Sequence, residues 1–153
     1  MTHSNSISYA ERADAVGVGA RAVAYAPAAL TILRIGVGLL YMQHGAQKLL
    51  GLFGGVDGNG GTVQLASQFG LAGIIELGGG LLIAIGFLTR PAALVAALEM
   101  LAALFVVHLP RGGAPVQNGG ELPLLYFLVF LYLASRGAGP YSVDAVFDRG
   151  RRS

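Results

Sequence analysis

Ionisable side chains lie inside the long hydrophobic runs of this chain, where they could hold a ligand or carry protons. Six of them are spread over four runs: Arg34, His44, Lys48, Glu76, Glu99 and Glu121. A charged group in hydrocarbon costs a few kcal/mol on insertion scales, so such groups rarely face lipid. We therefore expect these side chains to turn inward, where they pair with one another or line a polar cavity.

The first run carries a polar stripe along one helical face. Arg34, Tyr41 and Lys48 follow one another at intervals of two helical turns, and His44 lies one turn before Lys48. The stripe is either a packing face that small residues open to a neighbouring helix or the wall of a functional cavity. Glu76 of the second run approaches the same end of the membrane. The candidate ligand-binding pocket is therefore Arg34, Tyr41, His44, Lys48 and Glu76.

Two charge pairings follow from the depths of these residues. His44 or Lys48 can reach Glu76, and the pair either fixes the helix register or hydrogen-bonds a quinone carbonyl and relays a proton. Glu99 lies nearer the middle of its run, and Arg34 is its expected partner because helix rise places both at a similar depth.

A third polar cluster is expected around the second outer loop. It consists of His108, Arg111 and Glu121. With His44 it supplies two imidazoles and a carboxylate, which are metal-ligand types, but the spacing matches no metal motif and we predict no metal site. The glycine-rich stretch 54–61 lacks the context of a phosphate loop, and no Ser/His/Asp arrangement is present, so no catalytic residues are assigned.

The elements that position these groups are predicted to be membrane-spanning helices. The chain has 153 residues, of which 54% are hydrophobic and 12% charged, against roughly 25% charged residues in soluble domains. Its four hydrophobic runs cover residues 27–50, 71–88, 90–109 and 121–134, and about 20 apolar residues span a bilayer. Pro27 suits the first turn of the first helix. The predicted fold is all-α, an integral membrane four-helix bundle.

Basic residues predict the orientation and the environment. Seven arginines fall on one side of a four-span arrangement: Arg12, Arg21, Arg90, Arg136, Arg149, Arg151 and Arg152. This bias places both termini in the cytoplasm, with the chain in the bacterial inner membrane. The net charge of +2 gives no indication of nucleic-acid binding, and the absence of cysteine excludes disulfides and iron–sulfur ligation by this chain.

Three segments are expected. Residues 1–26 do not resemble a cleaved signal peptide and form a retained N-terminal segment, either an interfacial helix or a poorly ordered tail. Residues 27–145 form the membrane domain, and residues 146–153 form a basic tail.

Several short motifs, in this order and spacing, resemble the DoxX family of small membrane proteins. They include Leu33-Arg34-Ile35, His44-Gly45-x-x-Lys48, Glu76-Leu77-Gly78-Gly79-Gly80 and Ile85-Gly86-Phe87-Leu88-Thr89-Arg90-Pro91. The resemblance covers about residues 30–145 and matches the family's polar positions at Arg34, His44, Lys48, Glu76, His108 and Glu121. Glu99 is not assigned to that pattern.

The resemblance implies a four-helix membrane bundle and an association with membrane redox systems. Family members include a thiosulfate:quinone oxidoreductase subunit, partners of soluble oxidoreductases and quinone or catechol resistance proteins, whereas a distant relative acts in secretory cargo handling. The leading hypothesis is an accessory or quinone-interacting subunit of a redox assembly. It would have no intrinsic cofactor, a bound quinone, protein partners in the bilayer and no catalysis of its own. The alternatives are a purely structural assembly subunit and a small transporter or proton pathway.

Overall fold

The computed structural model describes residues 9–151, with side chains from residue 23 onward, and this part of the chain is helical without a β-strand. The α-helices are α1 Tyr9–Leu50, α2 Gln68–Ile74, α3 Gly80–Ile85, α4 Thr89–Ala103, α5 Pro115–Asn118, α6 Glu121–Arg136 and α7 Val143–Gly150. Short π-helical turns, η2 Ile75–Gly79 and η3 Leu104–His108, continue α2 into α3 and extend α4. The all-α prediction is confirmed.

Three helical segments are long and apolar enough to cross a membrane. They are Val23–Leu50, Gln68–Ile85 and Thr89–Arg111. Helix α6 has 16 residues, about 24 Å at 1.5 Å per residue, which is shorter than a typical span. The chain is thus a membrane protein, while the fourth span and the cytoplasmic placement of both termini stay predictions.

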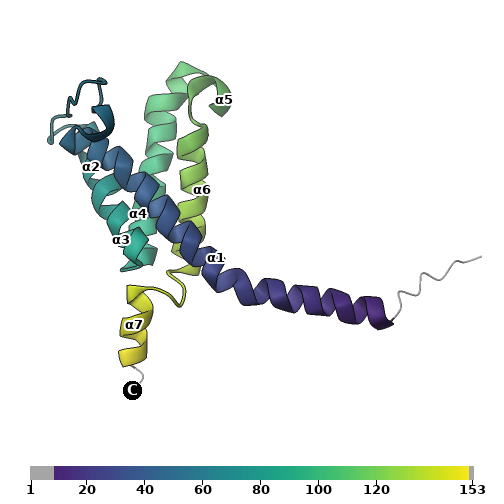
Figure 1. The fold of residues 1–153 in the computed structure, drawn as a ribbon. Coiled ribbons are helices and arrows are strands. Elements are labelled where there is room, and N and C mark those ends of the chain that lie inside the picture. The colour runs from purple at the N-terminus through teal and green to yellow at the C-terminus, as the bar shows by residue number, and fades with distance from the viewer. Residues whose placement is uncertain (1–8, 152–153) are drawn as a thin grey trace, which may run out of the picture.

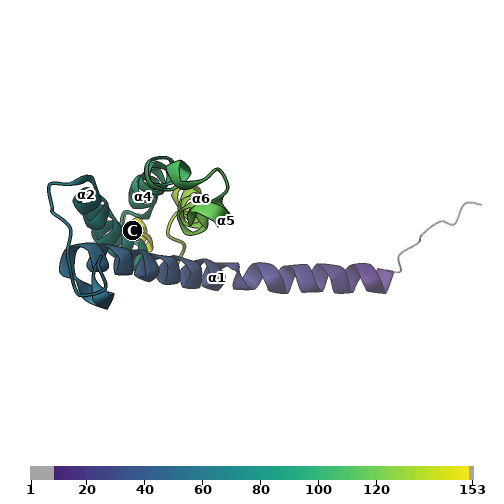
Figure 2. The same cartoon turned by 90° about the horizontal axis from the view of Figure 1, so that it is seen from above.

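Helix α1 is longer than the hydrophobic run from which it was predicted. It begins at Tyr9 and continues through Pro27, so the placement of Pro27 in its first turn is wrong. The helix changes direction part-way along, and its first part extends away from the other helices (Figure 1, Figure 2). Proline bends a helix because it lacks an N–H donor and crowds the preceding turn. Residues 9–26 are therefore helical. Their interfacial location stays a prediction, and residues 1–8 lie outside the described part.

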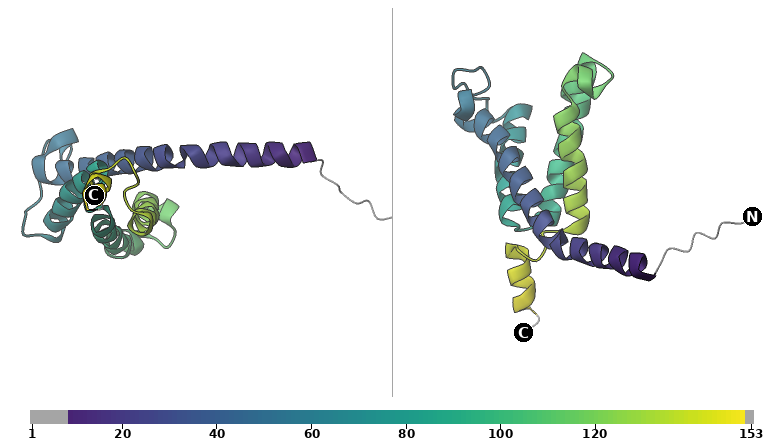
Figure 3. Two further views of the ribbon diagram at one scale, coloured as in Figure 1. Left: turned by 90° about the horizontal axis from the view of Figure 1, so that it is seen from below. Right: turned by 45° about the vertical axis from the view of Figure 1, so that its right-hand side comes forward.

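Close backbone approach joins α1 to α3. A Cβ added to Gly38 would lie 2.7 Å from the Ala84 nitrogen, and one added to Gly80 would lie 2.7 Å from the Gly38 carbonyl oxygen. Small residues at such crossings let membrane helices pack through their backbones. On the other side of the molecule α4 packs extensively on α6. The two groups lie close at the end of α3 and diverge toward α5 (Figure 3).

Arg34 fastens the C-terminal segment to the end of α3. Its side chain is buried, with a relative exposure of 1%. The guanidinium donates to the carbonyl oxygens of Ile83 and Ala84 at 2.8 and 2.6 Å and to that of Tyr141 at 2.8 Å. The first two carbonyls lie at the C-terminal end of α3, where a cation is favourable. Arg34 thus ties α1, α3 and the segment that leads to α7.

The glycine-rich loop between α1 and α2 is closed by an aspartate. The Asp57 carboxylate accepts hydrogen bonds from the backbone N–H groups of Asn59 and Gly61 at 2.9 and 2.8 Å. These donors lower the pKa of Asp57 because they stabilise its ionised form. The Gln47 amide also donates to the Gly55 carbonyl at 2.9 Å, which fastens the loop to α1.

Candidate membrane cavity

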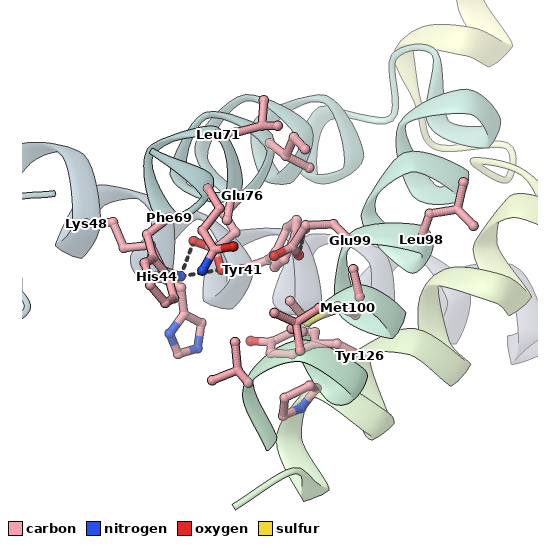
Figure 4. A pocket seen from close by; sticks show the side chains of 18 of the residues that line it. Tyr41, His44, Lys48, Phe69, Leu71, Glu76, Leu98, Glu99, Met100 and Tyr126 are labelled. Carbon is pink, nitrogen blue, oxygen red and sulfur yellow. Dashed lines mark hydrogen bonds and ion pairs between the residues drawn. The ribbon is translucent and has the colours of Figure 1, made fainter. Parts of the chain in front are cut away.

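A cavity of about 650 Å³ lies between the two diverging helix groups (Figure 4). Its walls come from α1, α2, η2, α4, η3 and α6 and are mostly apolar. The apolar lining includes Phe69, Leu71, Val95, Leu98, Met100, Val106 and Leu122. Polar groups at its surface come from Tyr41, His44, Lys48, Glu76, Glu99, His108 and Tyr126. An apolar cavity with a few convergent polar groups is the usual form of a small-molecule site.

An ion pair joins α1 to η2 at the cavity wall. The Lys48 ammonium lies 2.5 and 2.6 Å from the two carboxylate oxygens of Glu76. The Lys48 side chain is 22% exposed and that of Glu76 only 3%. The Lys48 side chain is therefore partly accessible and lines the cavity, and its ammonium compensates a buried carboxylate. Glu76 lies in a π-helical turn, and such turns occur frequently at functional sites.

A second carboxylate in the cavity is held by a tyrosine. The Tyr41 hydroxyl donates to Glu99 Oε2 at 2.8 Å, and the Tyr41 side chain is fully buried. Its ring packs edge-on against Phe130, with centroids 4.7 Å apart, and lies 5.6 Å from the Tyr126 ring. This aromatic packing fixes the hydroxyl that orients the Glu99 carboxylate.

Among the described residues, the His44 ring and the Tyr126 hydroxyl are groups of the cavity that have no hydrogen-bond partner. The His44 ring meets Tyr126 edge-on at a centroid distance of 6.0 Å. Within residues 9–151 its ring nitrogens have no hydrogen-bond partner, in contrast to Lys48, Glu76 and Glu99. The imidazole projects from α1 beside the Lys48–Glu76 pair (Figure 4). A ligand in the cavity would meet an unengaged donor and acceptor there.

The structure brings four of the five predicted pocket residues together. Tyr41, His44, Lys48 and Glu76 line the cavity, whereas Arg34 lies outside it and binds the backbone carbonyls at the end of α3. The predicted Arg34–Glu99 pair is corrected, since Glu99 binds Tyr41 instead. The physical reason is that three carbonyl oxygens compensate the guanidinium.

Glu99 and Tyr126 also line the cavity but do not belong to the pocket predicted from the sequence. The sequence prediction pairs Glu99 with Arg34 and does not include Tyr126, although Tyr126 lies one helical turn after Pro123 and both line the cavity. Helical spacing within α6 is the signal that could have identified Tyr126.

Only one residue of the predicted outer-loop cluster lines the cavity. His108 lines it and its Nδ1 lies 3.0 Å from the Asn118 carbonyl oxygen, whereas Arg111 and Glu121 do not belong to the lining. Among the described residues, no group of three or more His, Asp or Glu side chains could hold a metal ion.

Fold and cavity together define a helical membrane protein with polar groups around an intramembrane cavity. A model of the DoxX family matches residues 29–109, more than half of the chain. The chain belongs to the DoxX family, as its motifs indicated.

The chain is also similar to proteins from three bacteria. The chain is 39% identical over 126 residues to an uncharacterized protein of Haemophilus influenzae, an alignment that covers 80% of this chain and 93% of the relative. It is 28% identical over 129 residues to "Putative oxidoreductase CatD" of Bacillus subtilis, covering 80% and 89% of the two chains. It is 32% identical over 108 residues to "Inner membrane protein YqjF" of Escherichia coli, covering 63% and 80%. No solved structure matches the chain.

Proposed function

We propose that this protein is a quinone-interacting accessory subunit of a larger redox assembly in the bacterial inner membrane. One observation carries the proposal. One apolar cavity is lined by the His44 imidazole, which has no hydrogen-bond partner among the described residues, and by the Lys48–Glu76 ion pair. The Glu99 carboxylate, which accepts a hydrogen bond from Tyr41, lines the same cavity. The name of the Bacillus subtilis relative supports a link to oxidoreductases, and that of the Escherichia coli relative supports the inner membrane.

The cavity suits the chemistry of a quinone. A quinone ring is flat and apolar, so it packs on apolar and aromatic walls, and its two carbonyl oxygens accept hydrogen bonds. His44 and Lys48 supply donors from α1, and Glu76 orients the Lys48 ammonium. The volume of about 650 Å³ is within the range of small-molecule sites. In this role the chain binds and orients the quinone, and a partner protein supplies or accepts the electrons.

The test measures the quinone that copurifies with the protein. We would purify the full chain from its native membrane in mild detergent, extract it and quantify quinone per protein by chromatography. His44→Ala and Glu76→Gln are expected to lower the bound quinone about tenfold or more, since hydrogen bonds to charged groups contribute roughly 1.5–3 kcal/mol. Gln43→Ala and Glu121→Gln are the matched controls, because both side chains lie outside the cavity. Unchanged quinone content in His44→Ala and Glu76→Gln would contradict the proposal.

A purely structural role in an assembly is favoured by a different observation. The first part of α1 extends away from the other helices (Figure 2), and Val23 and Tyr25 within it are 73% and 72% exposed. A partner could pack on this part. Deletion of residues 1–26 should then release copurifying proteins, as seen by mass spectrometry, without changing the quinone content. Partners that stay bound after the deletion would contradict a docking role for this segment.

A further inference from the structure

A second hollow, of about 690 Å³, lies at the other end of α4 from His108. It is formed by the first turn of α4, the last turn of α6, and α7, which lies beyond the end of the bundle (Figure 3). Three arginines line it: Arg90, Arg136 and Arg151. Asp144 and Asp148 also lie in its wall, so cationic groups outnumber anionic ones.

The guanidinium groups of this hollow lack acidic partners within residues 9–151. Arg90 makes one long contact, 3.5 Å, to the Arg136 carbonyl oxygen, and the side chains of Arg136 and Arg151 make none. Asp144 is already engaged, since its carboxylate accepts from the backbone N–H groups of Leu88 and Thr89 at 2.8 and 3.0 Å. The positive charge of the hollow is therefore available to an anionic ligand.

A buried hydroxyl in the same wall also lacks a partner. Thr89 is fully buried, and its Oγ1 has no hydrogen-bond partner in the described part of the chain. Buried polar groups are normally satisfied by protein, water or ligand. Thr89 thus adds an unpaired polar atom to the wall of the hollow.

Each of two arginines lies at the end of an exposed apolar stripe. On α4, Leu94 and Leu98 follow Arg90 at intervals of four residues and are 49% and 57% exposed. On α6, Leu128 and Tyr132 precede Arg136 at the same interval and are 53% and 48% exposed. Residues four apart share a helix face. An anionic lipid has a negatively charged headgroup at the end of apolar acyl chains. An arginine at the end of an exposed apolar stripe is complementary to both parts of such a lipid.

We propose that this hollow binds the phosphate of an anionic phospholipid. The guanidinium forks of Arg90 and Arg136 hold the phosphate oxygens, Arg151 just after α7 adds a third cation, and the acyl chains lie on the exposed faces of α4 and α6. Arginine is suited to this role because its planar fork donates two parallel hydrogen bonds to a phosphate. The hollow shares no lining residue with the quinone cavity, and only Leu98 at the far end of the α4 stripe also lines that cavity.

The test is native mass spectrometry of the full chain, delipidated and then titrated with phosphatidylglycerol or with phosphatidylcholine of the same acyl chains. The wild type should bind phosphatidylglycerol more tightly. The double variant Arg90→Gln/Arg136→Gln should bind it about tenfold or more weakly, since two charge-assisted contacts are lost. The double variant Arg90→Lys/Arg136→Lys should lose less, because it keeps the charge without the fork, and it guards against a general folding defect.

The matched control is Arg111→Gln/Arg149→Gln, which removes the same charge outside the hollow. It should retain the wild-type preference. The proposal is overturned if the wild type binds both lipids equally, or if the control loses as much affinity as the Arg90/Arg136 variant. Equal competition by millimolar inorganic phosphate would also overturn it, because the site would then be one for free phosphate.

Discussion

At the scale of the residue, Arg34 shows how a buried cation can be compensated mainly by backbone carbonyl groups. Its guanidinium donates to three backbone carbonyl oxygens, and a Cβ on Gly86 would lie 2.6 Å from its Nη1 atom. Glycine at this position therefore leaves the space that the guanidinium occupies. The side chain acts as a C-terminal cap of α3 that also holds the Tyr141 segment.

The first prediction distinguishes this cap from the ion pair expected from the sequence. Arg34→Lys loses the fork that reaches several carbonyls and should lower the thermal stability in detergent by about 2 kcal/mol or more, as expected for lost hydrogen bonds to a charged group. Glu99→Gln keeps an acceptor for the Tyr41 hydroxyl and should change stability much less. Equal losses in both variants, with no further loss when they are combined, would instead indicate that Arg34 and Glu99 act as a pair.

At the scale of the element, the crossing of α1 and α3 depends on glycine for space. The neighbours of Gly38 and Gly80 are mainly backbone atoms, which cannot move away as a flexible side chain could. This crossing sets the position of η2, and hence of Glu76, against Lys48 on α1.

The second prediction uses two glycines of the same helix. Gly38→Ala should destabilise the protein by about 1–3 kcal/mol, a typical cost of overpacking, and should weaken the Lys48–Glu76 contact. Gly36→Ala is the control, because nothing lies within 4 Å of its added Cβ, and alanine favours helix by up to about 1 kcal/mol. Thermal unfolding in detergent measures both variants. Similar melting temperatures for the two would mean that the close crossing is absent.

The residues themselves explain which parts of the site were predictable. Lys48 and Glu76 were foreseen as neighbours because both lie near the same end of antiparallel apolar runs, and buried charges need compensation. The partners of Arg34 were not foreseen, because they are carbonyls, which every residue has and which leave no mark in the sequence. Likewise, the hydrophobic run and Pro27 predict a helix that begins near residue 27, whereas α1 has 42 residues and contains the proline in its interior.

At the scale of the whole molecule, α7 lies at the opposite end of the bundle from the loop after α1 (Figure 1). The Asp144 carboxylate of α7 accepts from the backbone N–H groups of Leu88 and Thr89 at the start of α4, whereas the loop joins the other ends of α1 and α2. The basic residues favour a cytoplasmic location for the α7 end.

The third prediction uses the absence of cysteine, which makes single-cysteine labelling unambiguous. Asn59→Cys lies in the loop after α1, and Val146→Cys lies on α7, where the native side chain is 61% exposed. In intact cells a membrane-impermeant maleimide should label Asn59→Cys, and it should label Val146→Cys only after permeabilisation. Labelling of both in intact cells would contradict the placement of the loop and of α7 on opposite sides of the membrane.

One uninterrupted helix carries both the extended first part of α1 and the residues His44 and Lys48 of the cavity. A protein that packs on residues 9–26 therefore contacts the same helix that carries the His44 imidazole and the Lys48 ammonium. Where such packing tilts α1, His44 and Lys48 move relative to the rest of the cavity, and the affinity of the cavity for its ligand changes. By thermodynamic reciprocity, ligand occupancy then changes the affinity for the protein by the same factor. In the proposed role, α1 would therefore link the occupancy of the cavity to the binding of a neighbouring protein.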